Sequence, residues 1–552
     1  MEATCKQYIR GNKAIIPYGK TIIDEDAFFG CKEITSVEIP ATVTQIDDKA
    51  FALCENLTEI IIPGSVTRIG YRAFYQCFNL KSIIIQGSLK QIEGSAFASC
   101  ISLESIELPD SVTEIRAWAF AYCSKLETVK LPKGIKEIRY GTFCGCKNLK
   151  IIEIPDTVKI IGYRAFENCS SLDSIVIPKS VETIEFSAFK GCESISSIEV
   201  PDSVKEIGYS AFSSCSSLSS IRLPESLNRL SSFLFSNCKQ LKSIKIPNSV
   251  QELDTYVFRC SGLETITIPN SIKRIEGWAF DHCWDLKSVI IPDSVNYIGT
   301  YAFRDCRLLR SLNIPESIQN IEPAMAIACT GLLSVKIPES VKSIGDGAFA
   351  SCSSLKSIEI PDSVSIIKSD AFAYCDELMS IEIPDSVQTI ERKAFYHCKK
   401  LTSIAIPDSV QSIDEEVFGE CYELTSIMMP NSIKSIGARA FCHCTDLRSI
   451  IIPDSVQSIG DGAFEGCTRL STVYIPDSIG ELPENVFSSC EGLRSVYLKS
   501  SHPNDLISKA LSEYGPMISL HVPVGSGYRY RHQNGFEVFK EIIADYYPEK
   551  NQ

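Results

Sequence analysis

Apolar residues recur along this chain with a period of 23 residues. The repeating unit reads L-x-S-I-x-I-P-D-S-V-x-x-I-G-x-x-A-F-x-x-C-x-x, and its positions are numbered 1 to 23 from the leucine. Apolar side chains occupy positions 1, 4, 6, 10, 13, 17, 18 and 21, while polar side chains fill most of the others. A fixed period of this length is typical of a solenoid, in which successive units stack as similar coils.

Each stretch of the unit predicts a local structure. The alternation around positions 3 to 6 predicts a short strand, and the proline at position 7 ends its pairing because it has no N–H group. Serine at position 9 suits a turn, and glycine at position 14, where present, permits a tight bend. One unit cannot bury its own apolar face, so copies stack and their strands pair in parallel. We therefore expect an α/β solenoid, a right-handed superhelix with one long parallel sheet, about 21 repeats and a small C-terminal α/β cap.

The cysteines follow the same period. The chain has 24, and all except Cys5, Cys144 and Cys442 lie on one ladder that runs from Cys31 to Cys490. Buried thiols, disulfides between coils and metal ligation are the three interpretations. The ladder side chains would all point the same way, the sheet already joins neighbouring coils, and the sequence has no C-x-x-C pair. The pattern therefore favours buried free thiols, and thus synthesis in a reducing compartment.

One local cluster carries metal-ligand chemistry, namely Cys442-His443-Cys444. Adjacent side chains on a turn diverge, whereas a tetrahedral zinc site needs converging ligands. A solvated histidine beside a buried cysteine is the favoured interpretation.

The unit resembles the 23-residue leucine-rich repeats of the Treponema type, which are found in BspA-like proteins. The matching motifs, L-x-S-I-x-I-P-D-S-V and I-G-x-x-A-F-x-x-C, are nearly intact from Leu355 to Cys375 and from Leu378 to Cys398. The resemblance extends from about residue 11 to residue 498. It implies a surface or secreted protein that binds host matrix proteins or other cells.

The ends of the chain depart from the period. We expect a degenerate N-terminal capping repeat over residues 1–16, the solenoid over 17–498 and a C-terminal cap over 499–552. Within the cap, the sequence predicts a helix over 505–514, a strand over 518–523 and a second helix over 536–544. Such atypical ends cover the exposed edges of a solenoid.

Charge and hydropathy limit the partners and the location. Lysine plus arginine number 54 against 68 for aspartate plus glutamate, a net charge of −14, which argues against a nucleic-acid partner. No apolar run approaches the roughly 18 residues of a membrane span. The first residues show no basic segment followed by an apolar one, so no secretory signal is expected. The resemblance implies a cell-surface or secreted protein, while the absent signal and the thiol-rich core leave a cytoplasmic scaffold as the alternative.

Two stripes of exposed positions are candidate partner-binding sites. The first follows positions 15 and 16 and consists of Trp118, Tyr140, Tyr163, Phe186, Tyr209, Phe233, Tyr256, Trp278 and Tyr301. The second follows position 5 of the last units and consists of Ala405, Met428, Ile451, Tyr474 and Tyr497. Aromatic residues and contiguous apolar patches are typical of contact sites, but lateral stacking or cover by the cap would also account for them.

Aspartate recurs at position 8, and stacked carboxylates could gather calcium. The residues are Asp362, Asp385, Asp408, Asp454 and Asp477. Aspartates at such a place more often accept hydrogen bonds from nearby backbone N–H groups, which is the interpretation we favour over calcium.

No enzyme motif is present. The sequence has no P-loop, no G-x-S-x-G and no H-E-x-x-H motif, and no histidine is visibly placed beside a nucleophile. We therefore expect no catalytic, cofactor-binding or metal-binding residues. The leading hypothesis is a non-catalytic, adhesin-like repeat protein that binds a protein or cell-surface partner through an extended face, and the alternative is an intracellular interaction scaffold.

Overall fold

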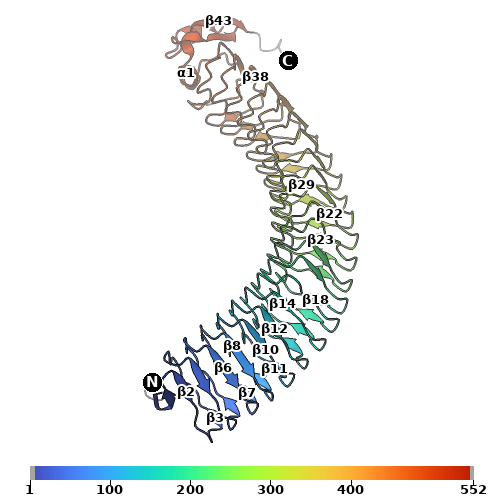
Figure 1. The fold of residues 1–552 in the computed structure, drawn as a ribbon. Helices are drawn as coiled ribbons and strands as arrows, with labels where there is room; N and C mark the ends of the chain where they lie inside the picture. Colours follow the sequence, from blue (N-terminus) through green and yellow to red (C-terminus); the bar gives the residue numbers. More distant parts are fainter. Residues whose placement is uncertain (1–5, 481, 547–552) are drawn as a thin grey trace. The chain divides into compact units, whose positions relative to one another are not determined.

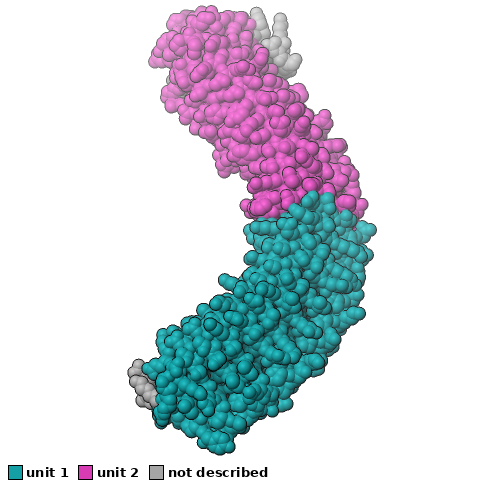
Figure 2. Space-filling view, viewed as in Figure 1, with its two compact units in different colours: residues 1–272 teal, residues 273–552 magenta. Residues whose placement is uncertain are grey.

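The computed structural model describes residues 6–480 and 482–546. These residues form two compact units, 1–272 and 273–552, which Figure 2 shows in different colours. Each unit is a parallel β-solenoid with little helix, in which successive coils present their strands side by side (Figure 1). The predicted fold class is confirmed.

The predicted strand at the start of each coil forms the first ladder. Its members pair in parallel with a register of one repeat, as in Ser105 with Thr128. In the first unit they are β2 (Lys13–Ile15), β4 (Ser36–Glu38), β6 (Glu59–Ile62), β8 (Ser82–Ile85), β10 (Ser105–Glu107), β12 (Thr128–Lys130), β14 (Ile151–Ile152), β17 (Ser197–Glu199), β19 (Ser220–Arg222) and β22 (Thr265–Thr267). In the second unit they are β24 (Ser288–Ile290), β26 (Ser311–Asn313), β28 (Ser334–Lys336), β30 (Ser357–Glu359), β32 (Ser380–Glu382), β34 (Ser403–Ala405), β36 (Ser426–Met428), β38 (Ser449–Ile451), β40 (Thr472–Ile475) and β41 (Ser495–Leu498).

A second ladder, absent from the sequence prediction, joins two-residue strands at positions 12 and 13. In the first unit they are β3 (Ile22–Ile23), β5 (Gln45–Ile46), β7 (Arg68–Ile69), β9 (Gln91–Ile92), β11 (Glu114–Ile115), β13 (Glu137–Ile138), β15 (Ile160–Ile161), β16 (Thr183–Ile184), β18 (Glu206–Ile207), β20 (Arg229–Leu230) and β21 (Glu252–Leu253). In the second unit they are β23 (Arg274–Ile275), β25 (Tyr297–Ile298), β27 (Asn320–Ile321), β29 (Ser343–Ile344), β31 (Ile366–Ile367), β33 (Thr389–Ile390), β35 (Ser412–Ile413), β37 (Ser435–Ile436) and β39 (Ser458–Ile459). Neighbouring coils are thus joined along two edges wherever both ladders pair, and each ladder is interrupted between some coils.

The core between the ladders consists of stacked columns of identical residues. The phenylalanines at position 18 lie ring on ring, with centroids 5.2 Å apart and an interplanar angle of 6° between Phe51 and Phe74. In the second unit, Phe349 and Phe372 repeat the arrangement at 5.7 Å. Both columns are completely buried. Because an aromatic ring buries a large apolar area, each coil covers the exposed face of the coil before it.

The thiol ladder is buried and reduced, as predicted. Every described cysteine is free, and all are buried except Cys260 of the shortened coil, which is half-buried. Most ladder thiols donate a hydrogen bond to the position-18 carbonyl of the preceding coil, as from Cys123 Sγ to Phe97 O at 3.2 Å. Phe97 O also accepts from the backbone N–H of Cys100 at 3.2 Å, so the thiol adds a second hydrogen bond to this buried carbonyl. Cys5 lies outside the described residues.

The turns of each coil use left-handed backbone at positions 16 and 20. Trp118 has a φ of 61° and Tyr122 a φ of 62°. This conformation directs their amides to carbonyl groups of the next coil, as from Trp118 N to Tyr140 O at 2.8 Å. Gly162 at position 14 has no positive φ, so left-handed backbone is not the reason for this glycine. A Cβ there would lie 2.7 Å from Ile138 O, so glycine is required by the close approach of two coils.

The ends of the chain carry different elements. At the N-terminus a 3-10 helix (Lys6–Tyr8) leads into β1 (Ile9–Arg10), which pairs antiparallel with β2. At the C-terminus the elements are α1 (Asp505–Leu511), a 3-10 turn (Gly515–Met517), β42 (Ser519–Pro523), α2 (Gly527–Arg531) and β43 (Glu541–Tyr546). The domain boundaries drawn from the sequence remain predictions.

The predicted helix over 536–544 is wrong. Residues 541–546 form β43, which pairs in parallel with β42, as Leu520 with Ile542. A helix would have left the edge of β42 open, whereas the strand continues the sheet for one further row. In the described part of the chain, no helix is long and apolar enough to pass through a bilayer.

Candidate functional site

The second predicted stripe forms a row on the outer face of the first ladder. Ala405 lies opposite Met428, and Ile451 lies opposite Tyr474, which in turn lies opposite Tyr497. Met428 is 68% exposed and Ile451 is 66% exposed, while the two tyrosines are half-buried. Side chains at this position alternate with the buried residue at position 4, so the pleat of each strand directs them to solvent.

The cap lengthens this row by residues that the sequence analysis missed. His521 of β42 stacks on Tyr497 with ring centroids 4.2 Å apart, and Tyr474 stacks on the other face of Tyr497 at 4.5 Å. Tyr546 of β43 meets the Tyr497 ring edge-on at 5.5 Å. The predicted strand over 518–523 could have placed His521 in the row, but the predicted helix over 536–544 concealed the strand that carries Tyr546.

An open depression of about 770 Å³ adjoins the row. Ile451, Tyr474 and Tyr546 line its apolar side, and an ion pair between Lys499 and Asp454 stands at its polar side. We name the set Met428, Ile451, Tyr474, Tyr497, His521 and Tyr546 the cap-proximal row. An apolar floor with a charged rim is the composition of a protein contact site.

The first predicted stripe is a stacked column in the first unit. Ring centroids lie 4.7 Å apart between Trp118 and Tyr140, 4.4 Å between Tyr140 and Tyr163, 4.1 Å between Tyr163 and Phe186, and 3.7 Å between Phe186 and Tyr209. Tyr140 and Tyr209 are the most exposed of these five residues, at 38% and 48%. Much of each ring is therefore covered by its neighbour, so stacking accounts for most of this column.

The remaining members of that stripe form separate pairs. Phe233 and Tyr256 stack at 4.6 Å in the first unit, and Trp278 and Tyr301 stack at 5.3 Å in the second. All four have left-handed backbone, with φ between 57° and 59°. Large residues rarely adopt this conformation, and the ring contacts help to offset its strain.

The candidate metal ligands do not converge. Cys444 Sγ points into the core and donates to Phe418 O, whereas burial raises the pKa of the neighbouring Cys442 thiol, which adjoins Arg439. Among the described residues, no group of three or more His, Cys, Asp or Glu side chains could hold a metal ion. At position 8, Asp110 accepts a hydrogen bond from the backbone N–H of Lys133 in the next coil. For the five aspartates of the predicted row, the turn and calcium interpretations remain predictions.

Comparison with known proteins gives the family. The model of the BspA type leucine-rich repeat region matches residues 21–150, 136–264, 254–379 and 366–494. A solved leucine-rich repeat protein from Bacteroides ovatus ATCC 8483 is similar at 30% identity and a TM-score of 0.50, over 68% of this chain and 87% of that chain. A leucine rich cell surface protein from Faecalibacterium prausnitzii A2-165 is 28% identical with a TM-score of 0.32, over 71% of this chain and 87% of that chain. Among curated protein sequences, none matches. The chain belongs to the BspA type leucine-rich repeat family.

Proposed function

We propose that this chain is a non-catalytic, adhesin-like repeat protein that binds a host matrix or cell-surface protein through the cap-proximal row. The observation that carries the proposal is the run of exposed apolar side chains on adjacent strands, Met428 and Ile451, which leads into the stacked Tyr474 and Tyr497. Exposed contiguous apolar patches are typical of contact sites, and tyrosine is enriched at their energetic centres.

The stacking prepares this surface for binding. Tyr497 is held between Tyr474 and His521, and His521 is in turn fixed by a hydrogen bond to Asp545 at 2.9 Å. Because these rings are already immobilised, a partner loses little side-chain entropy when it docks on them. Burying the exposed parts of Met428 and Ile451 would add about 1–2 kcal/mol each.

The first experiment captures partners from a host matrix extract with the wild type and with a Met428→Asp, Ile451→Asp double variant. Two buried charges should weaken binding by about 30-fold or more. The matched control is Ile290→Asp, which changes an equally exposed isoleucine (63%) at position 5 of β24 in the same unit. Equal binding by the wild type and the double variant would contradict the proposal.

A second arm addresses the aromatic stripe with Tyr163→Ala, Tyr209→Ala, Trp278→Ala and Tyr301→Ala in one variant. If partner capture is lost in that variant and retained in the double variant, the contact site lies on the stripe and not on the cap-proximal row.

Localisation is tested separately. A surface protein is open to added protease and antibody on intact cells, whereas an intracellular scaffold is found in the cytosolic fraction. The buried, reduced thiols favour the scaffold as the second candidate, because free cysteines persist in reducing compartments.

A further inference from the structure

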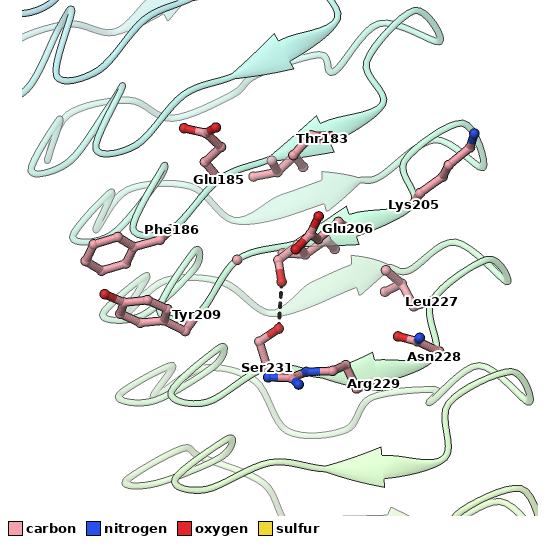
Figure 3. Close-up of a pocket in the computed structure, with 13 residues that line it drawn as sticks. Thr183, Glu185, Phe186, Lys205, Glu206, Tyr209, Leu227, Asn228, Arg229 and Ser231 are labelled. Atoms are coloured by element: carbon pink, nitrogen blue, oxygen red, sulfur yellow. Dashed lines mark hydrogen bonds between the residues drawn. The ribbon is translucent and has the colours of Figure 1, made fainter.

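The second ladder is interrupted twice in the first unit, between β11 and β13 and between β18 and β20, and a pocket lies at the second opening. β18 pairs with β16, and β20 pairs with β21, but no pairing joins β18 to β20 in the described chain. In the coil before the opening, the amide of Gly208 donates to Ile184 O at 2.8 Å. One coil later, the side chain of Ser231 makes the corresponding bond instead, from Oγ to Ile207 O at 2.7 Å (Figure 3).

Two departures from the repeat accompany this opening. Position 14 holds Ser231, whose side chain stands between the coils where Gly208 allows close contact. Position 17 holds the buried Leu234, where most coils have alanine. The rings of Phe212 and Phe235 are accordingly 6.1 Å apart, against 5.6 Å for the preceding pair. The larger side chains separate the two coils and leave a pocket.

The pocket has a volume of about 650 Å³ and one flat aromatic side. Tyr209 packs one ring face on Phe186 at 3.7 Å, and the aromatic column ends there, because the next coil carries Ser232 at that position. Figure 3 shows Phe186 and Tyr209 one above the other at one end of the pocket, with Glu206 and Ser231 at its centre. The other face of the Tyr209 ring is therefore a free stacking surface.

Acidic and basic side chains lie beyond the Tyr209 ring, from the centre of the pocket to its opposite end (Figure 3). Lys205 and Glu206 line the pocket and are exposed. Arg229 and Asn228 lie on the next coil, where Arg229 also contacts Asp254 at 2.8 Å. A polyanion would be repelled by Glu206, and a cation by Lys205 and Arg229. A hydroxyl group both donates and accepts hydrogen bonds, so it satisfies both kinds of side chain.

We propose that this pocket is a carbohydrate-binding site for a short oligosaccharide of hexose units. The apolar C–H face of one pyranose ring stacks on Tyr209, where it covers apolar surface. Hydroxyls of this unit and of the next hexose unit donate to Glu206 and accept from Arg229 and Asn228. The volume falls within the range of about 300–1,000 Å³ that is common for small-ligand sites. The site lies in the first unit, so it is independent of the proposed protein contact in the second.

The experiment is a glycan array that covers neutral, N-acetylated and uronic-acid oligosaccharides, probed with the full-length chain. Saturation-transfer NMR with the best-bound oligosaccharide then measures its contact with tyrosine protons. We expect Tyr209→Ala to lower the affinity at least tenfold and Tyr209→Phe to retain it, because stacking needs the ring and not its hydroxyl. Glu206→Gln should weaken binding by removing a charged acceptor.

Two further variants make the outcome decisive. Ser232→Phe extends the aromatic column over the free face of Tyr209 and should abolish binding without removing any pocket residue. Tyr140→Ala removes an exposed ring of the same column away from the pocket and should leave binding unchanged. Absence of binding to every glycan on the array would overturn the proposal, as would equal losses with Tyr140→Ala and Tyr209→Ala in proteins that show the same circular dichroism.

Discussion

Replacing three ladder cysteines by alanine should make the protein less sensitive to alkaline pH. Cys77, Cys123 and Cys169 are completely buried in the first unit. Their thiols donate to carbonyl groups of the preceding coils over 3.1–3.2 Å. Because no water reaches these sulfurs, the charged thiolate is strongly disfavoured in the folded chain. Ionisation of the thiols is therefore coupled to unfolding.

The size of the effect follows from the pKa difference. Burial raises the pKa of Cys123 from 9.0 to about 12, and it raises the pKa values of Cys77 and Cys169 as well. The stabilisation is fully present below pH 9 and is lost as the pH rises toward the folded-state value, because the unfolded chain then binds fewer protons. At pH 10 one thiol lowers the free energy of unfolding by about 1.4 kcal/mol, and three lower it by about 4 kcal/mol. Whole domains have stabilities of only about 5–15 kcal/mol, so the effect is measurable.

The assay is urea unfolding followed by far-ultraviolet circular dichroism at pH 7 and pH 10, with a phosphine reductant present. At pH 7 the triple alanine variant should be less stable by about 1–2 kcal/mol for each lost thiol. At pH 10 the difference in free energy of unfolding between the wild type and this variant should be smaller by about 4 kcal/mol. Tyrosine ionisation is common to all the proteins compared and cancels in the differences.

The control is a triple variant with Val66→Ala, Val112→Ala and Val158→Ala. These valines are completely buried in the same three coils and carry no proton. The loss in free energy of unfolding of this variant, relative to the wild type, should be the same at both pH values. If the cysteine variant also kept a constant deficit, the thiols would have to be solvated in the folded chain, and the buried ladder would be refuted.

Three other predictions concern the close contact between coils, the phenylalanine column and one half-buried carboxylate. Gly162→Ala should destabilise the chain by about 1–3 kcal/mol, because its Cβ would lie 2.7 Å from a backbone carbonyl, whereas Gly480→Ala, which has no neighbour within 4 Å, should be nearly neutral in the same urea titration. Phe97→Ala should cost about 3–5 kcal/mol by opening a cavity in the buried column, and a smaller loss in calorimetry would contradict the stacked core. Burial pushes the pKa of Glu420 upward, but hydrogen bonds from two tyrosines outweigh it and lower the pKa. The stabilisation that this carboxylate contributes should therefore be complete at neutral pH and be lost as the carboxylate is protonated in acid. In thermal unfolding measured from pH 6 to pH 3, Glu420→Gln should lose less stability than the wild type.

The sequence was sufficient to predict the columns of the core. Phe97 and Cys100 lie in adjacent columns because residues 23 apart must stack once the coils are similar. The second ladder could not be predicted because its strands are only two residues long. In β9, Ile92 is a single buried residue beside the half-buried Gln91, and this is too short for an alternating pattern. The strand β43 was missed for another reason. It forms by pairing with β42, which is distant in the sequence, and the residues 536–544 alone do not reveal this partner.

The candidate sites could be predicted only where the repeat fixes the neighbours. In a solenoid the residue beside any side chain lies one period away, so the end of the aromatic column at Tyr209 follows directly from Ser232. The separation of the coils does not follow, because it depends on how Ser231 and Leu234 are accommodated in a packed core. Residues that match the repeat consensus therefore specify the scaffold. Residues that depart from the consensus create the surfaces to which a ligand can bind. The coil that departs most from its neighbours is on this reasoning a better guide to a binding site than the coils that repeat faithfully.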